Sequence, residues 1–113
     1  MCSQSVLNEI ARRVVNAAQV SLGDKLDKVI LYGSYARGDN DDESDIDIMV
    51  LANISCEDRE YERNKIRSIL GRIDLDLDVV LSLKVTDCET FEKFLPVEPF
   101  YKNVMEDGVV LNA

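Results

Sequence analysis

The sequence predicts one small α/β (α+β) domain over residues 1–113, in which a small mixed sheet is covered by helices. Three observations lead to this fold class. The chain has 113 residues, which is enough for one domain. Apolar residues make up 46% of the sequence, which is enough to fill one core. Segments with helical and strand-like patterns follow one another without a low-complexity linker, so a second domain is not expected.

The first half of the chain predicts a helix and then two strands. Apolar residues recur at helical spacing over residues 5–22, and Gly23 can end that helix. Residues 28–32 form a short apolar run of strand-forming residues that ends at Gly33. Residues 45–51 alternate and then become fully apolar, which is typical of a strand that enters a core.

The second half predicts a helix and a third strand. Residues 55–58 have the pattern of a capping box, which opens a helix that ends at Gly71. Four side chains of this helix are expected to face inward: Tyr61, Ile66, Ile69 and Leu70. Leucine and aspartate then alternate, which predicts a strand over residues 74–82.

The last third of the chain predicts two short helices and an edge strand. Residues 86–89 form a second capping box and open a helix that carries three apolar residues: Phe91, Phe94 and Leu95. Two prolines then break the chain. A last helix is expected over residues 100–106, and residues 109–111 could form a final short strand. The aromatic residues of this region are expected to belong to the core.

The composition excludes several classes of protein. The chain has 13 basic and 22 acidic residues, a formal net charge of −9, and no histidine. Binding to nucleic acid is not expected, because it needs a basic surface that neutralises phosphates. Without histidine, Ser-His or Cys-His catalysis and a histidine-bound zinc ion are excluded. No apolar run approaches the ~20 residues of a membrane-spanning helix, so no membrane association is expected.

The cysteines and the N-terminus predict a cytoplasmic protein. The three cysteines, Cys2, Cys56 and Cys88, are odd in number and widely spaced, without a C-x-x-C motif. This pattern is neither a disulfide framework nor a metal site, so reduced thiols are expected. The N-terminus also lacks a basic segment followed by an apolar block, the pattern of a signal peptide.

The excess negative charge is confined to two short segments. Residues 39–47 contain six acids, and Asp74, Asp76 and Asp78 form a second cluster. Without these nine acids the chain would be neutral. Side chains alternate along a strand, so Asp45 and Asp47 share one face. If the predicted strands 45–51 and 74–82 are neighbours, carboxylates from both converge, and such a cluster is natural around a divalent ion such as Mg²⁺.

A second motif lies directly before the acidic run. Gly33 and Ser34 follow a predicted strand, and a Gly-Ser turn at that place lets backbone N–H groups approach a phosphate. The segment is not a Walker A loop, because Asp-Asn stands at residues 39–40 where Lys-Ser or Lys-Thr is required. The acidic run is not an EF-hand, because Ser44 and Val50 stand where glycine and glutamate are required.

The two motifs together resemble a known signature. Gly33-Ser34, ten intervening residues and Asp45-Ile46-Asp47 resemble the signature of the polymerase-β-type nucleotidyltransferase superfamily. The short chain and the form GSYARG resemble its minimal nucleotidyltransferase (MNT) group. The resemblance extends to the C-terminal FYKNVMEDGVVL. It implies a polymerase-β-type nucleotidyltransferase fold and a single minimal nucleotidyltransferase domain over residues 1–113.

The resemblance also implies a metal site. Two aspartates of the second strand and one of the third hold two Mg²⁺ ions in this superfamily. Asp45 and Asp47 match the first two. Asp78, which precedes two valines, is the best match for the third, and Asp76 is the alternative because the Leu-Asp pattern repeats.

Further roles follow from the same resemblance. Gly33 and Ser34 match the turn that binds the triphosphate, and Arg37 is expected to steady phosphate charge. The implied reaction is nucleotidyl transfer, in which an acceptor hydroxyl attacks the α-phosphate of ATP and pyrophosphate leaves. In the absence of histidine, Asp78, or else Asp47, is expected to take the proton.

The resemblance finally implies a partner. MNT proteins are typically encoded beside a HEPN protein, an RNase-type toxin. This chain would then be the antitoxin, and it would transfer AMP from ATP to a tyrosine hydroxyl of that toxin. Two alternatives remain open at this stage. One is an antitoxin that acts by binding alone, and the other is a nucleotidyltransferase that acts on a small molecule or an RNA end.

Overall fold

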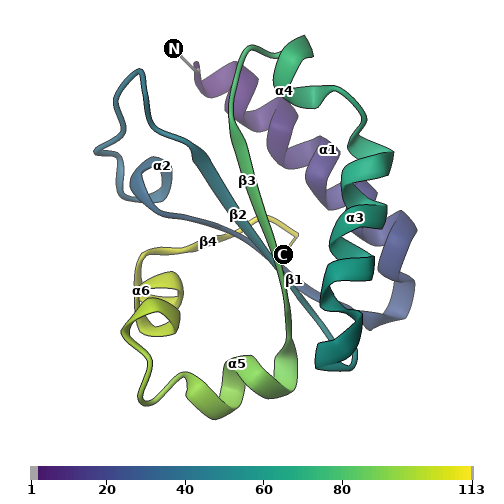
Figure 1. The fold of residues 1–113 in the computed structure, drawn as a ribbon. Coiled ribbons are helices and arrows are strands. Elements are labelled where there is room, and N and C mark those ends of the chain that lie inside the picture. Colours follow the sequence, from purple (N-terminus) through teal and green to yellow (C-terminus); the bar gives the residue numbers. More distant parts are fainter. Residues whose placement is uncertain (1–2, 113) are drawn as a thin grey trace.

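A four-stranded sheet organises the computed structural model, which describes residues 3–112 (Figure 1). Its strands are β1 (Leu26–Tyr32), β2 (Ile46–Ala52), β3 (Leu81–Asp87) and β4 (Val109–Val110), in the order β3-β2-β1-β4. β1 pairs antiparallel with β2 and with β4, whereas β2 and β3 are parallel. The predicted small mixed sheet is therefore confirmed.

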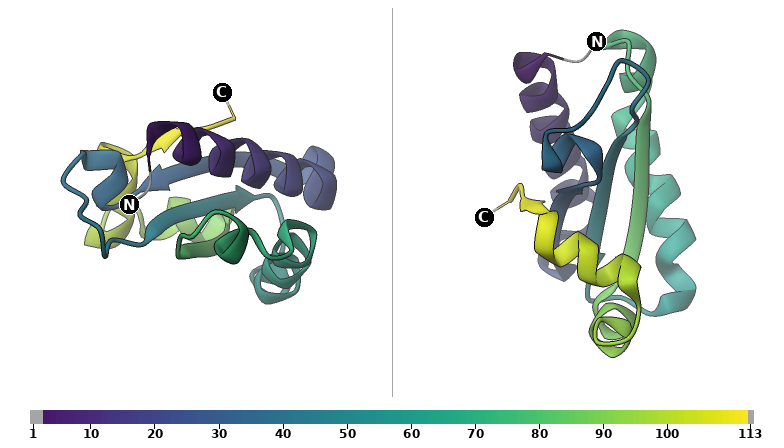
Figure 2. Two further views of the ribbon diagram at one scale, coloured as in Figure 1. Left: turned by 90° about the horizontal axis from the view of Figure 1, so that it is seen from above. Right: turned by 90° about the vertical axis from the view of Figure 1, so that its left-hand side faces the viewer.

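Helices cover both faces of this sheet. α1 (Gln4–Leu22) and α3 (Arg59–Leu70) pack on one face, and α5 (Cys88–Phe94) and α6 (Pro99–Asp107) pack on the other (Figure 1). Seen from above, α1 runs alongside the strands (Figure 2). Four short helices connect these elements: η1 (Gly23–Lys25), α2 (Ser34–Arg37), η2 (Cys56–Asp58) and α4 (Ile73–Asp76).

The alternation of β2 divides the core in two. Ile46, Ile48 and Val50 point into the larger cluster, beneath α1 and α3. Met49 and Leu51 point the other way, into a smaller cluster with residues of α5 and α6. Asp47 shares a face with Met49, because the two are separated by two positions. This carboxylate therefore lies on the α5 and α6 side of the sheet.

The two longest predicted helices are confirmed. α1 buries the apolar residues that predicted it, with Ile10 and Val14 fully inaccessible to solvent. Ser55 caps the start of η2, which leads into α3, and Ile66 and Leu70 face inward as predicted.

The inward direction predicted for Tyr61 and Ile69 is wrong. Both side chains are exposed. Glu62 is buried in their place, where its Oε2 accepts a hydrogen bond of 3.0 Å from Ser21 of α1. The buried face of α3 therefore includes Glu62, and Tyr61 and Ile69 lie outside it.

The predicted strand over residues 74–82 is wrong. Residues 73–76 form α4, and β3 begins only at Leu81. Ile73 is fully buried and Leu77 packs against the same core, a spacing of four residues that suits a helical turn. Leu75 is 72% exposed, so the alternation of leucine and aspartate does not correspond to one buried face.

The C-terminal elements are close to those predicted. Asp87, and not Thr86, is the N-cap of α5, since its carboxylate accepts a hydrogen bond of 2.9 Å from the backbone N–H of Thr90. Phe91 is buried, whereas Phe94 is exposed. The final helix and the edge strand are both present, as α6 and β4.

Two of the three cysteines lie in the described part of the chain. Cys56 and Cys88 are free thiols, and Cys2 lies outside the described part of the chain. Within residues 3–112, no helix has the length and apolar character needed to cross a membrane.

Replacing the N-cap of α5 should destabilise the fold. Asp87 is buried and also lies 3.2 Å from the guanidinium of Arg59. We expect Asp87→Ala to lower the free energy of unfolding by about 1–2 kcal/mol, as for other lost caps. Asp87→Asn keeps a capping oxygen and should lose less. Urea unfolding monitored by circular dichroism measures both, and an unchanged midpoint in Asp87→Ala would contradict the assigned cap.

Candidate active site

The turn after β1 places Gly33 and Ser34 at the end of the sheet. Gly33 has φ 74 and ψ −156, a region that residues with a Cβ rarely occupy. Ser34 then begins α2, a single helical turn that ends at Gly38 in the left-handed conformation. Apolar β1 ends against this turn, so the predicted position of the Gly-Ser motif is confirmed.

Asp47 packs directly against this turn. The register pairs Tyr32 with Asp47, which brings the carboxylate beside Gly33. A Cβ at Gly33 would collide with Oδ2 of Asp47 and would lie 3.2 Å from its Cγ. Glycine is therefore needed at position 33 for two reasons, the backbone conformation and the space that the Asp47 carboxylate occupies.

Asp45 and Asp47 form a pair of like charges at this edge. Asp45 is exposed just before β2, and Asp47 is partly buried within it. Burial, together with the charge of Asp45, raises the pKa of Asp47, while Arg37 and Lys84 act in the opposite direction. Burial and the charge of Asp47 also raise the pKa of Tyr32, to about 12. The site therefore favours an added cation, which would relieve the repulsion between the two carboxylates.

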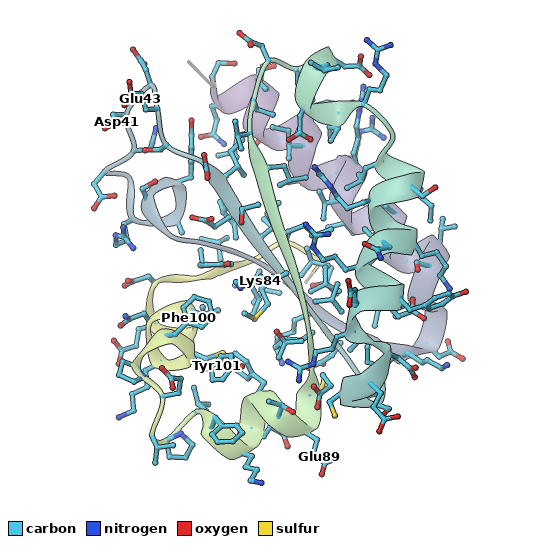
Figure 3. The ribbon with its side chains drawn as sticks, in the orientation of Figure 1. Asp41, Glu43, Lys84, Glu89, Phe100 and Tyr101 are labelled. Atoms are coloured by element: carbon cyan, nitrogen blue, oxygen red, sulfur yellow. The ribbon has the colours of Figure 1, made fainter. Side chains whose placement is uncertain are left out.

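The neighbour of Asp47 on β3 is a serine. The parallel register pairs Asp47 with Ser82, and Lys84 follows two residues later on the same face of the sheet. Lys84 is exposed, and its ammonium lies 5.8 Å from the centre of the Phe100 ring. Figure 3 shows Lys84, Phe100 and Tyr101 facing one another between β3 and α6. Asp47 thus has a hydroxyl and a cation beside it on β3.

The second acidic cluster is spread over α4 and the turn after it. Asp74 accepts a hydrogen bond from the N–H of Leu81 and pairs with Arg67 at 3.2 Å, so its role is structural. Asp76 ends α4 and is exposed. Asp78 has φ 53 and lines a hollow of about 280 Å³ together with Ser44 and Ile46. The predicted convergence of these carboxylates with Asp45 and Asp47 on paired strands is wrong, because they precede β3.

The side chains that could hold a metal ion are few within residues 3–112. No group of three acidic or cysteine side chains in this part of the chain is arranged to hold a metal ion. The site offers Asp45 and Asp47 instead. Two carboxylates suffice for Mg²⁺ when substrate phosphates and water supply the remaining ligands. The pair therefore fits a magnesium ion that is shared with a phosphorylated substrate.

The loop between α2 and β2 carries the remaining acids away from the site. Asp41 organises this loop by accepting hydrogen bonds from the Glu43 N–H at 2.9 Å and the Ser44 hydroxyl at 3.2 Å. Figure 3 shows Asp41 and Glu43 projecting at the far end of the loop. Arg37 pairs with Asp39 at 3.1 Å and remains close enough to lower the pKa of Asp47. Only two of the six acids therefore belong to the site.

Sequence reasoning missed Ser82 and Lys84. The predicted third strand ended at residue 82, which left Lys84 in a connection. Both residues reach the site only through the parallel register of β2 and β3. The buried alternation of Leu81, Leu83 and Val85 is the signal that could have located this strand.

An alanine at position 33 tests the contact with Asp47. We expect Gly33→Ala to destabilise the protein by about 1–3 kcal/mol, because it adds backbone strain and displaces the carboxylate. Gly23 also has a positive φ but has open space around it, so Gly23→Ala is the matched control for strain alone. Thermal unfolding compares the two variants. Equal losses would show that the contact between position 33 and Asp47 adds no constraint.

Neutralising Asp45 tests the coupling of the two carboxylates. The charge of Asp45 raises the pKa of Asp47, so Asp45→Asn should lower the pKa of Asp47 toward its ordinary value. NMR titration of the Asp47 side-chain carboxyl in metal-free buffer measures this shift. Asp41→Asn is the control, because Asp41 lies in the loop away from the site. A pKa of Asp47 that does not fall in Asp45→Asn would contradict the coupling.

Two curated proteins are similar to this chain in sequence. "Putative protein adenylyltransferase MJ0604" of Methanocaldococcus jannaschii is 35% identical over 100 residues, which cover 88% of this chain and 92% of that protein. "Putative protein adenylyltransferase MJ0141" of the same organism is 42% identical over 74 residues, which cover 66% of this chain and 73% of that protein.

Solved structures share the fold. The crystal structure of a "putative nucleotidyltransferase" from Sulfolobus solfataricus has a TM-score of 0.58 at 22% identity and covers 96% of this chain and 86% of its own. A chain in a complex of a tri-AMPylated Shewanella oneidensis HEPN toxin with an MNT antitoxin has a TM-score of 0.51 at 22% identity. That match covers 93% of this chain and 69% of the other. The predicted fold is thus confirmed.

The family model described as "Nucleotidyltransferase domain" matches residues 12–111. This match includes the Gly33-Ser34 turn, the Asp45 and Asp47 pair, and all four strands of the sheet. The chain therefore belongs to the nucleotidyltransferase family.

Proposed function

We propose that this chain is an antitoxin that transfers AMP from ATP to a tyrosine hydroxyl of a HEPN RNase toxin. The observation that carries the proposal is the packing of the Asp47 carboxylate against the Gly33-Ser34 turn. A triphosphate whose β- and γ-phosphates are held at this turn would have its α-phosphorus beside Asp45 and Asp47. The names of the two curated relatives, and the AMPylated HEPN toxin in one of the solved complexes, support a protein substrate.

The metal assignment follows from the donor set. Asp45 and Asp47 would hold Mg²⁺, which when bound neutralises phosphate charge and favours ionisation of the acceptor hydroxyl. The resemblance to the superfamily suggests two ions and a third carboxylate. Asp78 is the better candidate for that carboxylate, because it precedes two valines as in the superfamily pattern, and Asp76 is the alternative because the Leu-Asp pattern repeats.

The chain's own residues have separate tasks in the transfer. The Gly33-Ser34 turn and Arg37 bind the triphosphate and orient its β- and γ-phosphates. The acceptor oxygen forms a bond to the α-phosphorus, and the bond from that phosphorus to the bridging oxygen breaks. Pyrophosphate leaves with the electron pair. The acceptor proton passes to a carboxylate, Asp78 or Asp47, since the chain has no histidine.

The negative net charge of the chain is complementary to a basic toxin. The formal net charge of −9 would speed association with a basic, RNA-cleaving protein and would disfavour direct binding to nucleic acid. Reduced cysteines are consistent with a cytoplasmic location.

Binding without catalysis is the second candidate function. A purely binding antitoxin would not need two coupled carboxylates or a glycine whose missing side chain makes room for one of them. Transfer to a small molecule or an RNA end is a third candidate, and the acidic charge disfavours an RNA end.

Intact mass spectrometry distinguishes these functions. The protein encoded by the neighbouring gene is incubated with the chain, ATP and Mg²⁺. We expect its mass to rise by whole AMP units, and tandem mass spectrometry should place them on tyrosine. No mass gain despite a stable complex would support the binding function and contradict the proposed transfer.

Variants of the carboxylates provide the controls. The double variant Asp45→Asn, Asp47→Asn should abolish the mass gain, with a rate loss of about 10³-fold or more. Asp78→Asn should reduce transfer far more than Asp76→Asn. If the two single variants lose activity equally, the assignment of the third carboxylate is wrong.

A further inference from the structure

A groove of about 810 Å³ runs along β3, outside the Gly-Ser turn. Residues 82–86 of β3 form its floor, η2 and the start of α3 form one wall, and Phe100 and Tyr101 of α6 form the other. The groove begins at Ser82, the residue that the register places beside Asp47. It is therefore continuous with the candidate active site.

The geometry of phosphoryl transfer relates this groove to the acceptor. In an in-line displacement, the attacking and leaving oxygens lie on opposite sides of the phosphorus. The turn that would hold the leaving pyrophosphate follows β1, and β2 with Asp47 lies between β1 and β3. The acceptor oxygen would then arrive from the β3 side, where the groove lies.

We propose, on the basis of the function proposed above, that this groove binds the acceptor segment of the partner as an extended peptide in which acidic residues flank the acceptor tyrosine. Phe100, Lys84 and Arg63 would recognise it. The occupant is a polypeptide because the groove follows β3 from Ser82 to Thr86 and is lined by charged side chains and by aromatic rings.

Phe100 offers a surface for an aromatic acceptor. Phe100 is 37% exposed, although its ring belongs to a cluster of aromatic rings. It contacts Tyr32 edge to face at 5.7 Å and Tyr101 at 5.6 Å. Since Tyr32 is the register partner of Asp47, a tyrosine ring placed against Phe100 would lie near the reacting atoms.

Two cations that line the groove form no salt bridge in the described part of the chain. Arg63 is exposed and donates to the backbone carbonyl of Leu83, at 2.9 Å. Lys84 lies over the Phe100 ring and offsets part of the charge of Asp47. Neither forms an ion pair within residues 3–112, in a chain with nine more acids than bases. They are therefore available for acidic groups of a ligand.

The far end of the groove, beside η2, carries acidic side chains. Glu57 and Glu60 line it there, and Arg59 is already paired with Asp87, the last residue of β3. The groove is thus cationic beside Asp47 and acidic at its other end. This polarity places the acidic flank of the peptide next to the acceptor tyrosine.

Side chains, and not β-pairing, would hold this peptide. β3 is an edge strand, but its outward backbone groups are partly occupied. Arg63 donates to the carbonyl of Leu83, and Asp74 accepts from the N–H of Leu81. Such capping limits strand addition along the edge. Recognition would depend on the flanking charges and on the aromatic ring.

Fluorescence anisotropy with two labelled peptides tests the groove without ATP or metal. One peptide has a central tyrosine flanked by glutamates, and the other has the same tyrosine flanked by lysines. We expect the acidic peptide to bind the full chain about tenfold more tightly than the basic one. Arg63→Glu should reverse the preference, and Lys84→Gln should weaken the acidic peptide. Arg72→Glu, an exposed cation outside the groove, should leave the preference unchanged.

The outcomes separate this proposal from the proposed function. Equal affinity for both peptides, no binding of either, or equal effects of Arg63→Glu and Arg72→Glu would overturn the acceptor groove. Loss of ATP binding in Arg63→Glu with unchanged peptide binding would assign the groove to the nucleotide and would also overturn it. Peptide binding with the expected preference, but no AMP transfer to the toxin, would support the groove and contradict the transferase function.

Discussion

The contact between the Asp47 carboxylate and the Gly33 backbone is the constraint on which the site depends. The antiparallel register of β1 and β2 creates it, because Tyr32 and Asp47 are opposite one another. Any side chain at position 33 would occupy the space of the carboxylate. The turn and the carboxylate pair therefore form one unit. A phosphate bound at the turn has the carboxylates within reach, and no domain movement is needed to bring them together.

Repulsion between the carboxylates of Asp45 and Asp47 accounts for the two cations beside them. Asp45 and Asp47 repel one another, and partial burial of Asp47 adds to the cost of its charge. Arg37 from the end of α2 and Lys84 from β3 offset part of this cost, from opposite sides of β2. A bound Mg²⁺ would offset the rest. The same arrangement places a cation on the β3 side, where the proposed acceptor groove begins.

The spacing of apolar residues predicted those helices and strands that bury one continuous face. α1 and β2 follow from the spacing of apolar residues, because each presents a continuous face to a core. Residues 73–80 were not predictable in this way. Leu75 is exposed, and Asp74 is held by Arg67 and Leu81 from elsewhere in the chain, so tertiary contacts decide between helix and strand there.

The sequence by itself determined the fold class and the Gly33-Ser34 and Asp45-Asp47 motifs, because these motifs depend on residues that are close along the chain. The tertiary structure alone decided which β3 residues lie beside Asp47. A parallel pair of strands is joined by a long connection, here through η2, α3 and α4, and the connection does not set the register. Burial of Leu81, Leu83 and Val85 against α1 and α3 sets that register and thereby brings Ser82 and Lys84 to the site.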